Sequence, residues 1–166
     1  SVTVFIFEYQ FEKHENHPLF FRLKYDIIKQ IMIGVNIMTE WIIPCNPNYY
    51  KVDDAFSALK KLDWKQTSPK MQVGDIVYIY ISKPIMAIRY KCKVNKVNLD
   101  KIEIDDSKFV INGDSYETYP VHMELEVLEK YDNELTMEIL SNNGVKGRIQ
   151  CPRRVNPELK KYIHQL

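Results

Sequence analysis

Three kinds of side chain in this sequence are suited to bind a planar, phosphorylated ligand. Trp64 lies in a polar, basic segment, where an indole ring is suited to stack on a nucleobase. Asn46 follows an apolar run, and its amide can donate and accept hydrogen bonds at once, as the edge of a base requires. Arginine pairs bidentately with phosphate, and the candidates are Arg89, Arg148, Arg153 and Arg154. The alternatives are a structural Trp in the core, a plain Asn-Pro turn and an exposed basic turn.

Motifs for catalysis or for a resident metal are weak or missing. His14 and His17 stand three residues apart without further ligands beside them, so solvated loop histidines are the simpler interpretation. The triplets 63–65 and 158–160 have the acid-x-Lys shape of a metal-dependent nuclease but lack a second acid before them. No nucleophile elbow, Walker A motif or dinucleotide-binding glycine run is present. We therefore expect no metal, no cofactor and no enzymatic activity.

The cysteines and the hydropathy bear on the compartment. Cys45, Cys92 and Cys151 are widely spaced and form no metal-binding pair, which is typical of free thiols in a reducing cytoplasm. The sequence has no uncharged apolar run of roughly 18 residues or more, the length that a transmembrane helix needs. We therefore expect a cytoplasmic protein that does not span a membrane.

A net charge of +1 hides a segregated distribution. Residues 60–96 carry a net charge of +7, residues 97–134 carry −8, and residues 144–166 carry +5. If the two basic segments share a face, that face is suited to follow a phosphate backbone. The alternative is that opposite charges simply alternate around a solvated surface.

The first 38 residues differ from the rest of the chain. A β-like run at 2–11 is followed by a polar stretch and then by an apolar segment at 19–37, whose spacing is close to that of a helix. We interpret residues 1–38 as an N-terminal extension or arm. One hypothesis is an extension upstream of a natural start at Met38; the alternative is a true arm that packs on the domain or on a partner.

Residues 39–166 carry the pattern of one α+β domain. The expected strands are 41–43, 76–82, 85–97, 109–111 and 121–128, and the expected helices are 53–62, 134–141 and 156–165, with a loop at 63–73. The strand at 85–97 alternates apolar with basic residues, so one face should be core and the other wet and basic. Short strands with one early helix predict a small mixed β-barrel with flanking helices.

The order of several motifs resembles the EVE family of the PUA-like superfamily. The run 41–47 reads Trp-Ile-Ile-Pro-Cys-Asn-Pro, the helix contains Ala-Phe at 55–56, a Trp-Lys-Gln loop follows at 64–66, and Val-Gly-Asp enters a strand at 73–80. Segment 87–97 resembles the next barrel strand. The ending at 147–155 resembles EVE modules that precede HNH nuclease domains. The resemblance covers roughly residues 39–164, and it implies that residues 39–166 are a PUA-like domain.

The resemblance also implies roles for individual residues. EVE and YTH domains are similar folds that bind modified bases, and their stacking Trp and edge-reading Asn correspond to Trp64 and Asn46. The same site would include Gln66, Lys65 and Cys45 around the base. The second aromatic of the YTH cage falls near Val127, and the tyrosines that could replace it are Tyr80, Tyr90, Tyr116 and Tyr119.

Three functions follow as hypotheses. The first, which the resemblance to nuclease-fused EVE modules favours over RNA binding, is a non-catalytic reader of modified DNA, in a restriction or defence setting, that holds a flipped base in an aromatic pocket. The HNH portion of the fused relatives is absent here, so cleavage would need a separate nuclease subunit. The second is a PUA-like RNA-binding module that acts on tRNA or rRNA. The third is a small-molecule or protein-interaction domain in which Trp64 is only structural.

Overall fold

The computed structural model describes residues 38–112 and 119–166 of the chain. His14, His17, Tyr116 and the expected arm up to residue 37 lie outside the described residues. Met38–Leu166 form one compact unit. No helix in the described part of the chain is long and apolar enough to cross a membrane.

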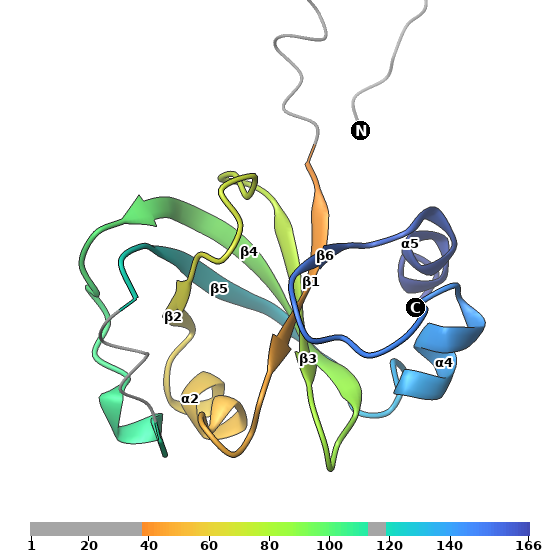
Figure 1. The fold of residues 1–166 in the computed structure, drawn as a ribbon, viewed down its shortest axis with the longest axis horizontal. Helices are drawn as coiled ribbons and strands as arrows, with labels where there is room; N and C mark the ends of the chain where they lie inside the picture. The colour runs from red at the N-terminus through yellow and green to blue at the C-terminus, as the bar shows by residue number, and fades with distance from the viewer. Residues whose placement is uncertain (1–37, 113–118) are drawn as a thin grey trace, which may run out of the picture. The chain divides into compact units, whose positions relative to one another are not determined.

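The described unit is built on a six-stranded sheet (Figure 1). Its strands are β1 (Glu40–Cys45), β2 (Lys61–Lys65), β3 (Ile76–Ile81), β4 (Ala87–Leu99), β5 (His122–Lys130) and β6 (Arg153–Arg154). The order across the sheet is β2-β5-β4-β3-β1-β6, with β1 and β3 parallel and the other pairs antiparallel. Within the described residues β2 and β6 are the two edges and do not pair. The class is α+β as expected, but the strand pairing shows an open sheet and not a closed barrel.

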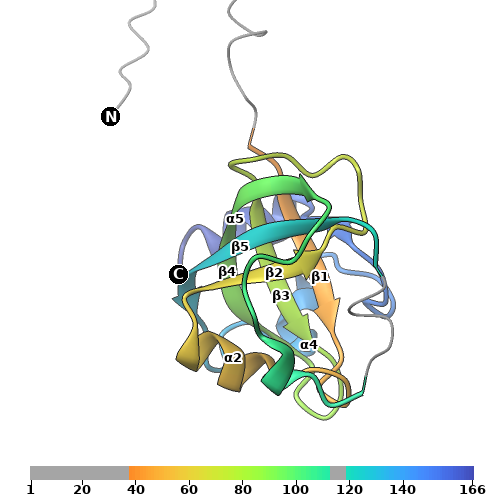
Figure 2. The same ribbon diagram turned by 90° about the vertical axis from the view of Figure 1, so that its left-hand side faces the viewer.

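Four short helical segments flank this sheet. They are α2 (Val52–Ala58), the 3-10 helix η1 (Ser107–Phe109), α4 (Met137–Asn142) and α5 (Pro157–Ile163). Helices α4 and α5 lie on one side of the sheet and α2 lies on the other (Figures 1 and 2). The fold is therefore layered, with helices on both sides of the sheet.

Two hydrophobic cores form on the two faces of the sheet, and β3 contributes to both. Val77, Ile79 and Ile81 pack with α2, whereas Tyr78 and Tyr80 pack with α4 and α5. Successive side chains of a strand point to opposite faces, so a strand covered on both sides must be apolar throughout. All six residues of β3 are buried, which explains its unbroken apolar sequence.

The expected helix at 53–62 ends early, and the expected loop at 63–73 begins with a strand. Helix α2 stops at Ala58 because Leu59 adopts an extended conformation, with φ −129° and ψ 128°. Lys61–Lys65 then form β2, in which Leu62 pairs with Leu125 of β5 and Trp64 pairs with Met123. The predicted position of Trp64 in a loop was wrong. Pairing with β5 overrides the helical spacing that Leu59 and Leu62 suggest.

The long strand predicted at 85–97 is confirmed as β4, with one change. Tyr90, Cys92 and Val94 are buried in the α2-side core, as their alternation predicts. Ile79 pairs with Tyr90 and Tyr80 pairs with Ile88, so Arg89 is the extra residue of a β-bulge. The bulge shifts the register, and Ile88 packs in the opposite core.

The C-terminal half contains one wrong prediction and two confirmed helices. The expected strand at 109–111 is instead η1 followed by a single bridge between Val110 and Tyr50. The helical turn expected at 134–141 is α4, which begins after Thr136. The helix expected at 156–165 is α5; the Asn156 side chain accepts a hydrogen bond from the Leu159 N–H at 2.9 Å, and a proline opens its first turn. Pairing of β6 with β1 had no signal in the sequence.

Candidate functional site

A pocket of about 290 Å³ opens where β1 ends, and four segments of the chain line it. They are the end of β1 with its turn (43–50), the end of β2 (64–67), residues 110 and 112 after η1, and residues 150 and 152 before β6. The pocket lies at the lower limit of the size range for small-ligand sites. We call it the aromatic pocket because it is lined by Tyr49, Tyr50 and Trp64.

Two of these rings form a right-angled corner. The centroids of Tyr50 and Trp64 lie 5.7 Å apart with an interplanar angle of 86°, the edge-to-face geometry that aromatic pairs prefer. The Tyr50 hydroxyl donates to Asp106 Oδ2 at 2.5 Å, and this bond fixes the ring. Trp64 is half-buried on β2. The pocket is thus bordered by the indole of Trp64, which packs against the core, and by the phenol of Tyr50, which its hydrogen bond orients. Tyr49 is 56% exposed.

Asn46 lines the pocket, and the oxygen and nitrogen of its side-chain amide differ in their hydrogen bonding. Its Oδ1 accepts from the Asn48 N–H at 3.0 Å, and its backbone oxygen accepts from the Tyr49 N–H at 3.0 Å. These bonds hold the turn that presents both tyrosines. No described residue accepts a hydrogen bond from Asn46 Nδ2, and the side chain is exposed. The amide donor is therefore available to a ligand.

Lys65 and Cys45 complete the predicted residues that line the pocket. Burial lowers the pKa of Lys65, whose Nζ lies 5.8 Å from the centroid of Tyr119. Burial, with a smaller contribution from the Asp53 charge, raises the pKa of the Cys45 thiol to about 12. The thiol is therefore protonated at neutral pH, and it can contribute packing but not a thiolate nucleophile.

Gln66 is not part of the pocket lining. Its side chain is buried and forms two hydrogen bonds with Asn98: Nε2 donates to Oδ1 at 3.1 Å, and Oε1 accepts from the Asn98 N–H at 2.7 Å. Asn98 has a positive φ of 57° at the end of β4. The Gln66 side chain thus ties the end of β2 to β4, and its amide is already occupied.

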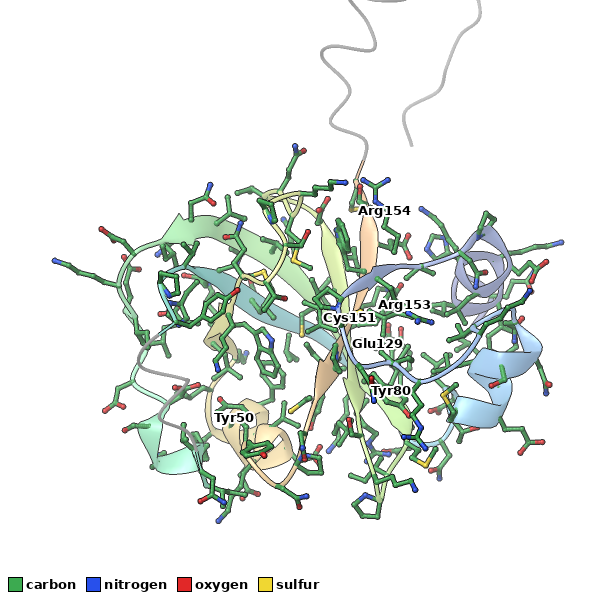
Figure 3. All side chains as sticks on the ribbon, in the orientation of Figure 1. Tyr50, Tyr80, Glu129, Cys151, Arg153 and Arg154 are labelled. Carbon is green, nitrogen blue, oxygen red and sulfur yellow. The ribbon has the colours of Figure 1, made fainter. Side chains whose placement is uncertain are left out.

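The four arginines predicted to bind phosphate have different surroundings in the structure and do not form one cluster. Arg89 donates to the backbone oxygen of Asp132 and lies 3.8 Å from its carboxylate. Arg153 Nη1 donates to the Lys146 oxygen at 3.1 Å, and the Arg154 guanidinium lies 5.4 Å from the centroid of the Trp41 ring. Both are on β6, as Figure 3 shows. Only Arg148 lines a cavity next to the aromatic pocket.

That second cavity has a volume of about 530 Å³ and shares Asn46 and Gln150 with the aromatic pocket. It lies between the β3–β4 loop, α4 and the segment before β6. Among the residues that the structure describes, no group of three or more His, Cys, Asp and Glu side chains is arranged to hold a metal ion.

The basic segment 60–96 and the acidic segment 97–134 pair with each other on neighbouring strands. Lys96 on β4 lies 3.1 Å from Glu124 on β5, which also accepts from Lys61 on β2 at 2.9 Å. Lys91 lies 3.4 Å from Glu129. Opposite charges on paired strands stabilise the sheet. These lysines are therefore not the unpaired basic face that the charge distribution suggested.

Tyr49 and Tyr50 are pocket residues that the sequence argument missed. Tyr80 and Tyr90, two of the residues expected to supply the second aromatic, are almost fully buried, at 5% and 2% exposure. The available signal was the run Pro-Asn-Tyr-Tyr at 47–50, directly after Asn46.

Comparison with known proteins gives structural matches alone. No family model matches the chain, and no curated protein sequence matches it. A hypothetical protein from Leishmania major is 17% identical, with a TM-score of 0.55 over 77% of this chain and 93% of that one. ASCH from Zymomonas mobilis is 10% identical, with a TM-score of 0.53 over 77% and 95%. A protein from Pseudomonas syringae is 18% identical, with a TM-score of 0.54 over 76% and 97%. These similarities show that residues of this chain share the fold of ASCH from Zymomonas mobilis and of the two other proteins.

Proposed function

We propose that this protein is a nucleic-acid-binding module that holds one unstacked base in the aromatic pocket. The observation that carries the proposal is the perpendicular pair of Trp64 and Tyr50 beside the available Asn46 amide. A base would stack on the indole and present its edge to Nδ2 of Asn46. Stacking on an aromatic side chain contributes about 1–3 kcal/mol per base.

We favour RNA as the ligand. Sequence-specific RNA recognition uses bases that are splayed out and stacked on aromatic side chains, which is the geometry that this pocket offers. The similarity to ASCH and PUA-like structures supports the same class. A reader of modified DNA with a separate nuclease subunit rests on the EVE resemblance alone, and it is the second candidate.

A titration of labelled oligonucleotides tests the proposal. Single strands of RNA and DNA with one sequence, each with and without N6-methyladenine or 5-methylcytosine, would be titrated by fluorescence anisotropy at two salt concentrations. Trp64→Ala should weaken binding by about tenfold or more. Trp64→Phe keeps a stacking ring and much of the packing on β2, so it should retain most of the affinity. Thermal unfolding of both variants separates lost binding from lost folding.

The outcomes distinguish the candidates. A preference for RNA supports the proposal. A preference for methylated DNA assigns the module to modified DNA and revives the restriction setting. If no oligonucleotide binds, or if a folded Trp64→Ala variant binds as well as the original chain, the pocket is not a base site and the ligand is a small molecule or a protein.

A further inference from the structure

The second cavity adjoins the aromatic pocket but has a different chemistry. The two share Asn46 and Gln150, so a ligand that fills one lies directly beside the other. In Figure 3 Tyr50, of the aromatic pocket, and Tyr80, of the second cavity, lie on the two sides of the end of β1. The remaining residues of the second cavity are Asn48, Ser82, Lys83, Met86, Met137, Ser141, Gly147, Arg148 and Ile149.

Two cations border the second cavity from opposite segments. Lys83 lies in the loop between β3 and β4, and Arg148 lies in the segment after α4. Both side chains are exposed, and neither forms an ion pair with any residue that the structure describes. This contrasts with Lys61, Lys91 and Lys96 on the sheet, which are paired with glutamates. Positive charge that the fold does not neutralise is thus present at this cavity.

The other lining groups suit a sugar and a second base. Met86 and Met137 provide flexible, polarisable surface that adapts to a flat ring. The hydroxyl of Ser82 and the amide of Asn48 lie at the same cavity and can donate to sugar or phosphate oxygens. An adjacent nucleotide needs these three features together: a cation for its phosphate, polar groups for its sugar and an apolar surface for its base.

We propose that the second cavity is the subsite for the nucleotide that adjoins the pocketed base in the same strand, with its phosphate between Lys83 and Arg148. This inference rests on the proposed function of the aromatic pocket. Arg148 is suited to bidentate contact with the phosphate, and Lys83 acts as a point charge. Asn46 and Gln150 lie at the junction of the two sites. The minimal ligand is therefore a dinucleotide and not a single base.

The test compares single nucleosides with dinucleotides. The four ribonucleosides and deoxyribonucleosides, and the matching homodinucleoside monophosphates such as ApA and dApdA, would be titrated in a Trp41→Phe background, so that the fluorescence of Trp64 alone is followed. The original chain should bind the preferred dinucleotide about tenfold more tightly than its nucleoside, because one phosphate adds charge-assisted hydrogen bonds. In the double variant Lys83→Gln/Arg148→Gln the dinucleotide should lose that advantage.

A matched control removes the same charge elsewhere. Lys93→Gln/Lys161→Gln changes two exposed lysines outside both cavities and should keep the full advantage of the dinucleotide. Equal affinity of nucleoside and dinucleotide for the original chain would overturn the second subsite and leave the base pocket intact. Equal losses in both double variants would also overturn it, since the effect would then be bulk charge. If neither ligand quenches the fluorescence, the proposed function itself fails.

Discussion

Asn46 has a structural role in its turn, and the proposed function gives the same amide a role in recognition. Its oxygen accepts a hydrogen bond from the Asn48 N–H at 3.0 Å and holds the turn, whereas its nitrogen has no hydrogen-bond partner among the described residues, and the residue lines the pocket. Replacement by alanine removes both groups, so it cannot tell the two roles apart. Replacement by aspartate keeps an oxygen at the turn and removes only the donor.

Asn46→Asp should therefore weaken oligonucleotide binding without unfolding the protein. The lost hydrogen bond, together with a new negative charge beside the base, should lower the affinity by about tenfold. The melting temperature should stay close to that of the original chain because the turn keeps its acceptor. Anisotropy titration and thermal unfolding check the two halves. Unchanged affinity would remove Asn46 from base recognition.

Asp75 contributes to stability because its side chain accepts several hydrogen bonds. Its buried carboxylate accepts from the Trp41 indole N–H at 2.9 Å, from the Thr39 N–H at 2.9 Å and from the Gln72 N–H at 3.0 Å. It thereby joins the start of β1 to the turn before β3. Gly74, with a φ of +93°, allows the chain to enter this turn.

Asp75→Ala should lower the free energy of unfolding by about 3 kcal/mol, because three donors lose a buried, charged acceptor. Urea unfolding measures the change. Asp132→Ala is the control, since the Asp132 side chain is 81% exposed and its loss should change stability by less than about 0.5 kcal/mol. A loss below about 1 kcal/mol for Asp75→Ala would show that the three donors find other acceptors.

At the scale of elements, helix α5 is fastened to β1 through Glu40. Glu40 is 5% exposed. Its carboxylate lies 2.9 Å from Lys160 Nζ and 2.9 Å from His164 Nε2, and it accepts a hydrogen bond from the Tyr78 hydroxyl at 3.1 Å. Burial by itself raises the pKa of Glu40, but the Lys160 hydrogen bond, the charges of His164 and Lys160 and the Tyr78 hydrogen bond together lower it below 4.5.

This arrangement predicts a dependence of stability on pH. A carboxyl group whose pKa is lowered by folding stabilises the fold above its unfolded pKa, near 4.5, and the stabilisation is lost as the pH falls through the folded value. Glu40→Gln should therefore be less stable than the original chain at pH 7 and should lose less stability between pH 5 and pH 3. Urea unfolding across that range checks this. Glu138→Gln, on the exposed side of α4, should keep the original pH profile.

The elements differ in how far the sequence predicts them. Strands β3 and β4 and helix α5 follow from local signals: an apolar run, an alternation and an Asn-Pro start. Strand β2 has no such signal, because the charged residue Asp63 interrupts the apolar residues Leu62 and Trp64. Asp63 Oδ2 accepts from the N–H groups of Glu103 and Ile104, at 2.6 and 2.8 Å, some forty residues away.

The candidate site shows the same division. Trp64 and Asn46 were predicted from their chemistry and from the resemblance, Lys65 and Cys45 from the resemblance alone, and all four line the aromatic pocket. The orientation of Tyr50 depends on Asp106, which no local pattern connects to it. Gln66 was expected at the base, yet it bonds to a residue of β4. Side chains that are placed by distant partners are those that the sequence could not place.

For the molecule as a whole, the charge pairing between strands limits how strongly salt should affect binding. The affinity for a single strand falls with a log–log slope of about −0.7 for each phosphate that a cation neutralises. With one phosphate held between Lys83 and Arg148, we expect a slope of about −0.7 for a short oligonucleotide. Titrations between 50 and 200 mM salt, roughly the range over which such slopes are measured, would check it.

The variant Lys83→Gln/Arg148→Gln should bring this slope close to zero, while Lys93→Gln/Lys161→Gln should leave it unchanged. A slope several times steeper would mean that the lysines of β2 and β4 leave their glutamates to bind phosphate. That result would restore the basic face suggested by the charge distribution and would contradict the paired network on the sheet.

The aromatic pocket is assembled from four segments that are spread over more than a hundred residues, so it exists only when the whole unit is folded. Any true ligand consequently binds the native state and not the unfolded chain. By mass action, a ligand at a hundred times its dissociation constant adds about 2.7 kcal/mol to the free energy of unfolding. A thermal-shift screen of nucleosides, nucleotides and small metabolites can therefore search for the natural ligand without any assumption about its class.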